Sequence, residues 1–330
     1  MRSFLKTTDF TAAELSALMD AASRLKRGES LGDLRDRTMG MVFFNPSLRT
    51  RTSFEVGLFQ LKGHAVNLSV GQGMWELEYR DGTVMDGRAA EHIKEAAPVL
   101  GRYVDILGVR AFAEGKDWEA DRLDPVLSAF EKHSGVPVIN MESAVWHPCQ
   151  ALADGMTWQE LGVSGKDRIV LTWAYHPKAL PMAVPNSVML MAAQMGLHLT
   201  VARPEAFALD RDLVRESSLI ASRNGGVLEE TDDWGSVKGA KIVYAKSWGS
   251  LRAYGRPDEE KEIRLNYKGW QVTAKEMAGG ARFMHCLPVR RNVVVADEVL
   301  DSAASAVVQQ AENRLHTQKA LLLKLLGGAI

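Results

Sequence analysis

Short, almost uninterrupted apolar runs alternate with longer amphipathic segments along the chain, and this alternation restricts the fold more than any other feature. Such runs are typical of strands buried on both faces, and strands separated by helices form parallel sheets with helices on both sides. The sequence therefore predicts an α/β protein with two doubly wound parallel-sheet domains. The predicted strands are 39–44, 64–70, 104–109, 136–140, 168–173, 197–202, 241–245 and 281–285.

The segments between these strands carry helix signals. Thr11-Ala-Ala-Glu14 is a capping box, which predicts a helix that continues to Leu25. The segment His176–Asn186 interrupts the pattern, and its three prolines favour a surface loop. Further helices are predicted at 50–61, 91–103, 123–132, 148–161 and about 310–326.

The length of the chain predicts two domains, because 330 residues exceed what one hydrophobic core usually serves. We expect one domain at 1–150, with a C-terminal helix at 310–330 packing back on it, and a second domain at 151–309. The formal net charge of -1 and the lack of a long apolar stretch suggest no nucleic-acid or membrane partner. Two cysteines imply no disulfide framework, so a reducing compartment, the cytoplasm, is expected.

One segment, Ser47-Leu48-Arg49-Thr50, lies where a predicted strand ends and a helix begins. A helix N-terminus presents unpaired backbone N–H groups and a positive dipole end to an anion. The hydroxyls of Ser47 and Thr50 and the guanidinium of Arg49 add phosphate-binding donors. Taken alone, the segment is equally compatible with an N-capped helix whose arginines are solvated.

Three further polar segments also follow predicted strands: Arg110, His147-Pro148-Cys149-Gln150 and His285-Cys286-Leu287-Pro288. Each has an ordinary alternative, namely a surface arginine, a His-Pro helix start and a buried cysteine. Their joint position at strand carboxyl ends, where open α/β sheets bind ligands, favours a binding site. The sequence has no complete dinucleotide fingerprint and no metal-ligand spacing, so neither a cofactor nor a metal is expected.

In order and spacing these segments resemble those of the aspartate and ornithine carbamoyltransferases, over essentially the whole chain. Asn140-Met141-Glu142, Tyr244–Trp248, Trp75 and the His176–Asn186 loop most resemble the N-acetylornithine and N-succinylornithine carbamoyltransferase branch. The resemblance implies a carbamoyl phosphate domain followed by an amine-substrate domain. It also implies a homotrimer with shared active sites, in which Trp75 reaches a neighbouring subunit, and a knotted proline-rich loop.

The resemblance also implies roles for individual residues. The carbonyl oxygen of carbamoyl phosphate is expected to accept hydrogen bonds from Arg110, His147 and Thr50. Cys286 is also expected to be catalytic. The remaining carbamoyl phosphate contacts are expected from Ser47, Leu48, Arg49, Trp75, Gln150, Leu287 and Arg314. The acylornithine is expected to contact Glu142, His176, Lys246, Leu287, Arg290 and Ala90.

One departure from ordinary ornithine carbamoyltransferases bears on the amine substrate. Those enzymes hold the α-ammonium of ornithine with an acid, whereas this stretch, Val243–Gly249, carries Lys246 instead. A buried ammonium beside Lys246 would lack a counter-ion and be repelled, while an acylated nitrogen has no charge. The sequence thus favours an N2-acylornithine as acceptor, giving N-acylcitrulline and phosphate in arginine biosynthesis. The alternatives are a carbamoyltransferase for another amine, such as ornithine, and a non-catalytic binding relative.

The identity of the acyl group is inferred from Ala90. The acetyl-preferring pattern has a glutamate there, whose charge would repel the second carboxylate of a succinyl group. That pattern also has a lysine where this chain has Val294. With Ala90 the repulsion is absent, so the sequence favours N-succinylornithine over N-acetylornithine, with His176, Arg290 and Lys246 as candidates to hold the added charge.

Overall fold

The computed structural model describes residues 2–327, and the chain divides into two compact units. Unit 1 comprises the chain up to Glu114, Glu119–Leu152 and the chain from Arg314 onward, and unit 2 comprises Gly115–Trp118 and Ala153–Asn313. The boundaries fall inside helices α6 (Pro148–Glu160) and α11 (Val307–Leu325). Met1 and residues 328–330, the ends of the predicted N-terminal and C-terminal ranges, lie outside the described residues.

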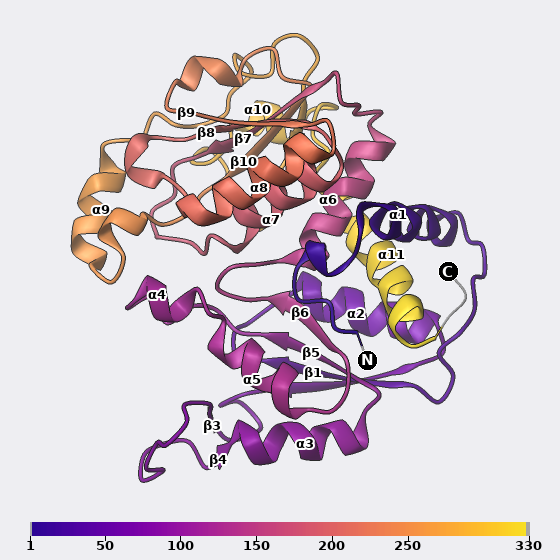
Figure 1. The fold of residues 1–330 in the computed structure, drawn as a ribbon. Helices are drawn as coiled ribbons and strands as arrows, with labels where there is room; N and C mark the ends of the chain where they lie inside the picture. Colours follow the sequence, from indigo (N-terminus) through magenta and orange to yellow (C-terminus); the bar gives the residue numbers. More distant parts are fainter. Residues whose placement is uncertain (1, 328–330) are drawn as a thin grey trace. The chain divides into compact units, whose positions relative to one another are not determined.

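Unit 1 contains a four-stranded, all-parallel sheet with the order β2-β1-β5-β6. Its strands are β1 (Thr38–Phe43), β2 (His64–Ser69), β5 (Ile106–Arg110) and β6 (Val138–Glu142). The central strand β5 and its neighbour β6 are buried at every position, which explains why apolar residues predominate in both. Figure 1 shows α3 (Ile93–Tyr103) and α5 (Pro125–His133) on one side of the sheet and α2 (Arg49–Gln60) on the other.

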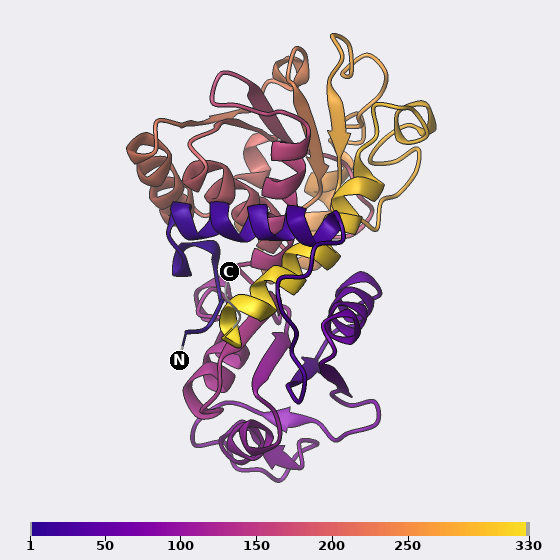
Figure 2. The ribbon, with the colours of Figure 1, turned by 90° about the vertical axis from the view of Figure 1, so that its right-hand side faces the viewer.

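The helices of unit 1 begin with α1 (Ala12–Lys26), where Thr11 and Glu14 form the predicted capping box. The C-terminal part of α11 lies beside α2 in both views of the ribbon (Figures 1 and 2). Lys319 Nζ donates to Gln60 Oε1 at 2.8 Å between these two helices. The helix predicted from residue 91 begins two residues later, because β4 (Glu91–His92) pairs in parallel with β3 (Leu77–Glu78).

Unit 2 contains a five-stranded, all-parallel sheet with the order β11-β10-β7-β8-β9. The two parallel sheets confirm the predicted α/β class, while the knot stays a prediction. The strands are β7 (Arg168–Trp173), β8 (His198–Ala202), β9 (Val227–Thr231), β10 (Ile242–Lys246) and β11 (Arg282–Met284). Helices α7 (Ala183–Gln194) and α8 (Arg211–Arg223) pack against each other on one face (Figure 1). The shorter elements are α4 (Trp118–Asp121), α9 (Pro257–Leu265), α10 (Asp297–Leu300) and the 3-10 turns Thr7–Asp9, Glu205–Phe207, Trp234–Val237 and Leu251–Ala253.

The expectation of a surface loop over His176–Asn186 is wrong for the second half of that segment. Helix α7 begins at Ala183, and all of its residues are buried. Pro185 lies in the first turn of the helix, where a backbone N–H has no intrahelical partner to lose. His176, in the first half, is also buried.

Among residues 2–327, no helix is long and apolar enough to cross a membrane. The same residues contain no group of three or more His, Cys, Asp or Glu side chains arranged to hold a metal ion.

Candidate active site

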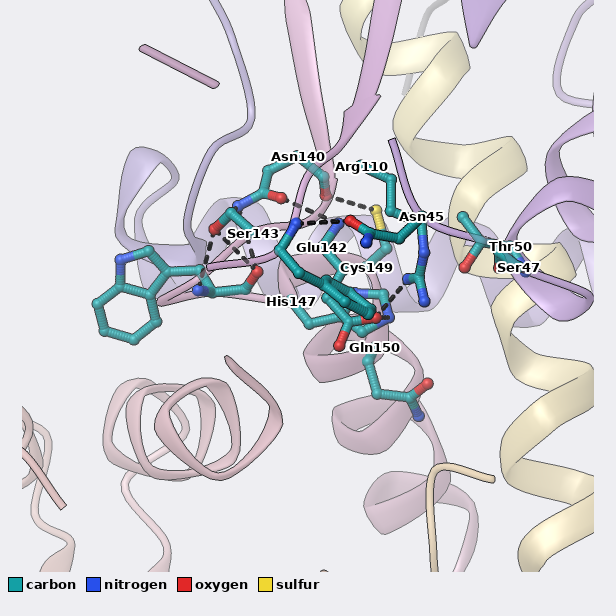
Figure 3. Close-up of polar contacts among 12 residues, drawn as sticks. Asn45, Ser47, Thr50, Arg110, Asn140, Glu142, Ser143, His147, Cys149 and Gln150 are labelled. Atoms are coloured by element: carbon teal, nitrogen blue, oxygen red, sulfur yellow. Dashed lines mark hydrogen bonds and ion pairs between the residues drawn. The ribbon is translucent and has the colours of Figure 1, made fainter. Parts of the chain in front are cut away.

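The polar residues of unit 1 gather where its strand order reverses. The chain runs from β1 outward to β2, then returns to β5 on the other side of β1 and continues to β6. The loops that follow β1, β5 and β6 therefore diverge at one edge of the sheet, which is where open α/β sheets bind ligands. Figure 3 shows side chains from these three loops and from the start of α6 meeting there.

The loop after β1 leads into the N-terminus of α2 and hydrogen-bonds to its first turn. Ser47 Oγ accepts a hydrogen bond of 3.2 Å from the backbone N–H of Thr50, which fixes the first turn. The Thr50 side chain is buried, whereas Leu48 is 75% exposed. The expected contact of Leu48 with carbamoyl phosphate would therefore be made by its backbone or by its exposed side chain. The turn leaves the positive end of the α2 dipole at the strand edge.

Arg314, from α11, is a buried cation whose hydrogen bonds go to neutral groups of unit 1. Its guanidinium donates to Thr50 Oγ1 at 3.0 Å and to Gln150 Oε1 at 2.9 Å, and lies 3.5 Å from His147 Nε2. Burial lowers the pKa of Arg314, and repulsion by Arg110 adds to the effect. An anion bound beside Arg314 would offset both the desolvation of the buried charge and its repulsion by Arg110. The arrangement therefore favours a small anionic ligand.

Arg110 follows β5 and meets Glu142, the last residue of β6. Arg110 Nη1 donates to Glu142 Oε2, and His147 Nε2 lies 3.6 Å from the same oxygen. The Arg110 guanidinium also packs over the ring of Phe112, 4.5 Å from its centre. Its Nε is buried and has no acceptor among the described residues. Glu142, expected to contact the acylornithine, thus orients Arg110 in this structure.

The loop between Glu142 and His147 is held by residues to which the sequence analysis gave no binding or catalytic role. Asn140 Nδ2 donates to Ser143 Oγ at 3.0 Å and to the Trp146 carbonyl at 3.3 Å, and its Oδ1 accepts from Glu142 N at 3.0 Å (Figure 3). These bonds turn the loop so that Glu142 and His147 face Arg110. A buried Asn directly before a candidate loop is the signal that identifies such a residue.

Asp124 supports the same loop from the start of α5. Its carboxylate accepts from Ser143 Oγ at 2.7 Å and from Ala144 N at 2.8 Å. Burial raises the pKa of Asp124 to about 6, although these hydrogen bonds act in the opposite direction. Burial likewise raises the pKa of Cys149 to about 12, so this thiol is protonated and is no nucleophile.

Unit 2 has its own reversal of strand order, between β7 and β10. Lys246, the last residue of β10, is paired in register with Trp173, the last residue of β7. Its buried Nζ donates to the carbonyl of Ser247 at 3.0 Å. Lys246 is therefore a buried cation at the carboxyl edge of the second sheet, as Arg314 is in unit 1.

His176, in the loop after β7, contacts Arg290. Arg290 Nε donates to His176 Nε2 at 2.9 Å, and His176 Nδ1 lies 2.9 Å from the Lys178 carbonyl. Burial lowers the pKa of His176, and the charges of Arg290 and Lys246 lower it further. His176 is thus an acceptor for Arg290, and its expected contact with the acylornithine stays a prediction.

The remaining predicted residues lie on two loops. Leu287 follows β11 and Cys286 with a positive φ of 57°, and the Leu287–Pro288 peptide is cis. In unit 1, Trp75 is 56% exposed, and its indole Nε1 donates to Glu91 Oε2 at 2.7 Å. Ala90, beside Glu91, is exposed, and its N–H donates to the carbonyl of Glu76 at 3.2 Å.

Comparison with known families identifies the chain. Residues 2–160 match the aspartate/ornithine carbamoyltransferase carbamoyl-P binding domain, and residues 182–325 match the Asp/Orn binding domain of the same enzymes. The chain belongs to the aspartate/ornithine carbamoyltransferase family. It is therefore a member of an enzyme family that transfers carbamoyl groups, as the sequence predicted.

Two relatives differ in the acyl group that their names carry. The N-acetylornithine carbamoyltransferase of Xanthomonas campestris pv. campestris is 47% identical over 335 residues, which cover 99% of this chain and 98% of the relative. The N-succinylornithine carbamoyltransferase of Bacteroides fragilis is 38% identical over 294 residues, 88% of each chain. A solved N-acetyl-L-ornithine transcarbamylase, a glutamate-to-alanine variant complexed with carbamyl phosphate and N-succinyl-L-norvaline, is 46% identical with a TM-score of 0.95. It covers 98% of this chain and 100% of its own.

Proposed function

We propose that this chain transfers the carbamoyl group of carbamoyl phosphate to the δ-amine of an N2-acylornithine, giving an N2-acylcitrulline and phosphate. The observation that carries the choice of amine is Lys246, buried at the carboxyl edge of the second sheet. A free α-ammonium next to this cation would be desolvated and repelled, whereas an acylated nitrogen is neutral. Lys246 is then available to pair with the α-carboxylate of the substrate.

The carbamoyl phosphate end of the reaction is assigned to unit 1. The phosphate binds at the α2 N-terminus with Ser47, Arg49 and Thr50, and Arg314 supplies a buried positive charge. Arg110 and His147 point donors at the carbonyl oxygen, with Glu142 orienting both. Such donors act most strongly when negative charge develops on that oxygen in the transition state.

The chemical step follows from this arrangement. The neutral δ-amine attacks the carbamoyl carbon, a tetrahedral oxyanion forms, and its collapse expels phosphate. Gln150 and the backbone groups of Cys286 and Leu287 are assigned to the carbamoyl NH₂. The amine must first lose a proton, because an alkylamine of this kind has a pKa of about 10. That first proton is released to solvent before the attack. The nitrogen loses a second proton as the tetrahedral intermediate collapses, and the departing phosphate is a suitable acceptor for it.

N-acetylornithine is the acyl substrate that the comparisons favour, which revises the preference for succinyl drawn from Ala90. The N-acetylornithine relative is 47% identical and the N-succinylornithine relative 38%. N-succinylornithine is kept as the second candidate because Ala90 leaves no carboxylate at its position. The N-succinyl-L-norvaline complex of a glutamate-to-alanine variant of a related enzyme supports this alternative.

The decisive experiment measures citrulline formation and phosphate release with N-acetylornithine, N-succinylornithine and ornithine. We expect kcat/KM to be highest for one of the two acylated amines. A higher value for ornithine would refute the argument from Lys246. Activity with none of the three would leave a non-catalytic binding relative as the remaining interpretation.

We also propose that the chain assembles as a homotrimer with shared active sites. Trp75 is more than half exposed, and the exposed apolar residues of α2 include Phe59, which is 81% exposed. Both side chains are exposed enough to contact a neighbouring subunit. Mixing Trp75→Ala chains with Arg110→Gln chains should restore part of the activity if each site draws on two subunits. A fully active monomer in sedimentation analysis would refute the assembly.

A further inference from the structure

The backbone after β11 adopts a conformation that needs support. Leu287 has a φ of 57°, in the left-handed region that a non-glycine residue enters only at a cost in free energy. Leu287 is bound through its backbone N–H, which donates to the ring nitrogen His285 Nδ1 at 2.9 Å. The His285 side chain is buried, so this acceptor has few alternative positions.

His285 is itself held by a buried network. Its backbone N–H donates to Gln310 Oε1 at 3.0 Å. Gln310 Nε2 in turn donates to Asp154 Oδ1 at 2.6 Å and to Tyr244 Oη at 3.0 Å, and Tyr244 Oη donates to Asp154 Oδ2 at 3.2 Å. All four of these residues are buried in unit 2, and they come from α6, β10, α11 and the end of β11.

The hydrogen bonds define the state of the ring. A backbone N–H can bond to His285 Nδ1 only if that nitrogen carries a lone pair, so the proton of the neutral ring is on Nε2. A protonated ring would present a second donor to the Leu287 N–H. The network therefore requires a neutral imidazole with a fixed tautomer.

We propose that His285 is a positioning residue that holds the Cys286–Leu287 backbone in place for the carbamoyl group, with Gln310 anchoring His285. The role rests on the proposed function, which assigns the backbone groups of Cys286 and Leu287 to the carbamoyl NH₂. His285 acts through Leu287 and needs no contact with the substrate.

Two matched variants test the role of the acceptor. In His285→Asn the side-chain oxygen lies the same number of bonds from Cα as Nδ1, whereas in His285→Gln it lies one bond farther. We expect His285→Asn to bind carbamoyl phosphate within about threefold of the wild type, and His285→Gln to bind it about tenfold more weakly. The probe is phosphonoacetamide, a stable carbamoyl phosphate analogue, measured by calorimetry on the intact protein.

The measurement needs no amine substrate, so the inference and the proposed function can fail separately. Equal affinities in both variants, whether wild-type or equally reduced, would overturn the role of His285 whatever amine the enzyme uses. Loss of folded protein would lower the number of binding sites without changing the affinity, and that result would also count against the proposal.

A second variant tests directly whether His285 acts through Leu287. Leu287→Gly removes the cost of the left-handed conformation, because glycine adopts positive φ freely. If His285 acts through Leu287, the effects of His285→Gln and Leu287→Gly on the affinity should not add in the double variant. Additive effects would show that the two residues act independently and would refute the proposal.

Discussion

The two sheets place their candidate site residues at equivalent positions but stabilise them in different ways. In each sheet the strand order reverses, and polar side chains follow the carboxyl ends of the strands beside the reversal. In unit 1 the ionic groups are buried together: Arg314 bonds to Thr50 and Gln150, and Arg110 bonds to Glu142. In unit 2, histidine rings hold candidate binding groups as hydrogen-bond acceptors, since His176 accepts from Arg290 and His285 accepts from Leu287.

This difference fits the ligands proposed for the two units. A small dianion such as phosphate offers only charge and hydrogen-bond acceptors, so its site gains most from cations fixed in a dry environment. An acylornithine offers an amide, a carboxylate and an alkyl chain, and its recognition depends more on the placement of neutral groups. We expect changes of charge to affect unit 1 more strongly than unit 2.

The largest effect is expected for Arg314→Met. The variant removes a buried cation together with the hydrogen bonds that it donates to Thr50 Oγ1 and Gln150 Oε1, so we expect turnover to fall at least about a hundredfold. Inorganic phosphate should raise the Tm of the wild type by binding to the folded state, and this rise should vanish in the variant.

Lys319→Met is the matched control for Arg314. Lys319 lies on the same helix, and its pKa is also lowered by burial, but its bond goes to Gln60 away from the strand edge. The Tm of Lys319→Met should still rise with phosphate. An equal loss of the response in both variants would show that helix packing, and not the guanidinium, controls anion binding.

Much of this fold could be predicted from the sequence, because buried parallel strands appear as continuous apolar runs. β9 could not be predicted, since Val227–Thr231 is a polar strand whose side chains are largely exposed. The start of α7 could not be predicted because a proline signals a break, although it is tolerated in the first turn of a helix. Whether such a proline breaks the chain or begins a helix depends on the tertiary packing around it.

The candidate site residues were predictable where several polar segments follow predicted strands. Arg110, His147 and Gln150 were selected on that joint position, and the structure places them beside Glu142 or Arg314. Asn140 and Asp124 were given no site role, because they act through the backbone of a neighbouring loop. Such roles depend on contacts between distant segments, which periodicity and motif spacing do not reveal.

A smaller effect is expected for Asp124, whose pKa is raised to about 6 in the folded chain from a usual value near 4. Between these values the native state binds more protons than the unfolded state, so stability falls as pH rises. The full shift corresponds to about 2–3 kcal/mol. We expect the Tm of the wild type, relative to that of Asp124→Asn, to decrease from pH 4 to pH 7.

Asp36→Asn is the control for this measurement. Both Asp36 and Asp124 have positive φ, which asparagine also tolerates, so backbone effects cancel, but Asp36 is exposed. The pH dependence of Asp124→Asn is therefore compared with that of Asp36→Asn, which measures the effect of the same substitution at an exposed position. A pH dependence no larger for Asp124→Asn than for Asp36→Asn would contradict the burial of a titrating carboxyl.

The smallest effect concerns the acyl group and the variant Ala90→Glu. A carboxylate at this exposed position is partly screened, so it should repel the second carboxylate of a succinyl group only moderately. We expect kcat/KM for N-succinylornithine to fall about tenfold relative to N-acetylornithine, which corresponds to about 1.4 kcal/mol in the transition state.

Ala90→Gln is the matched control, because it adds nearly the same volume without charge. If Ala90→Gln shifts the preference as much as Ala90→Glu does, size and not charge controls selection at this position. If neither variant shifts it, Ala90 does not contact the acyl group, and the preference must be set by residues of unit 2 such as Arg290 and Lys246.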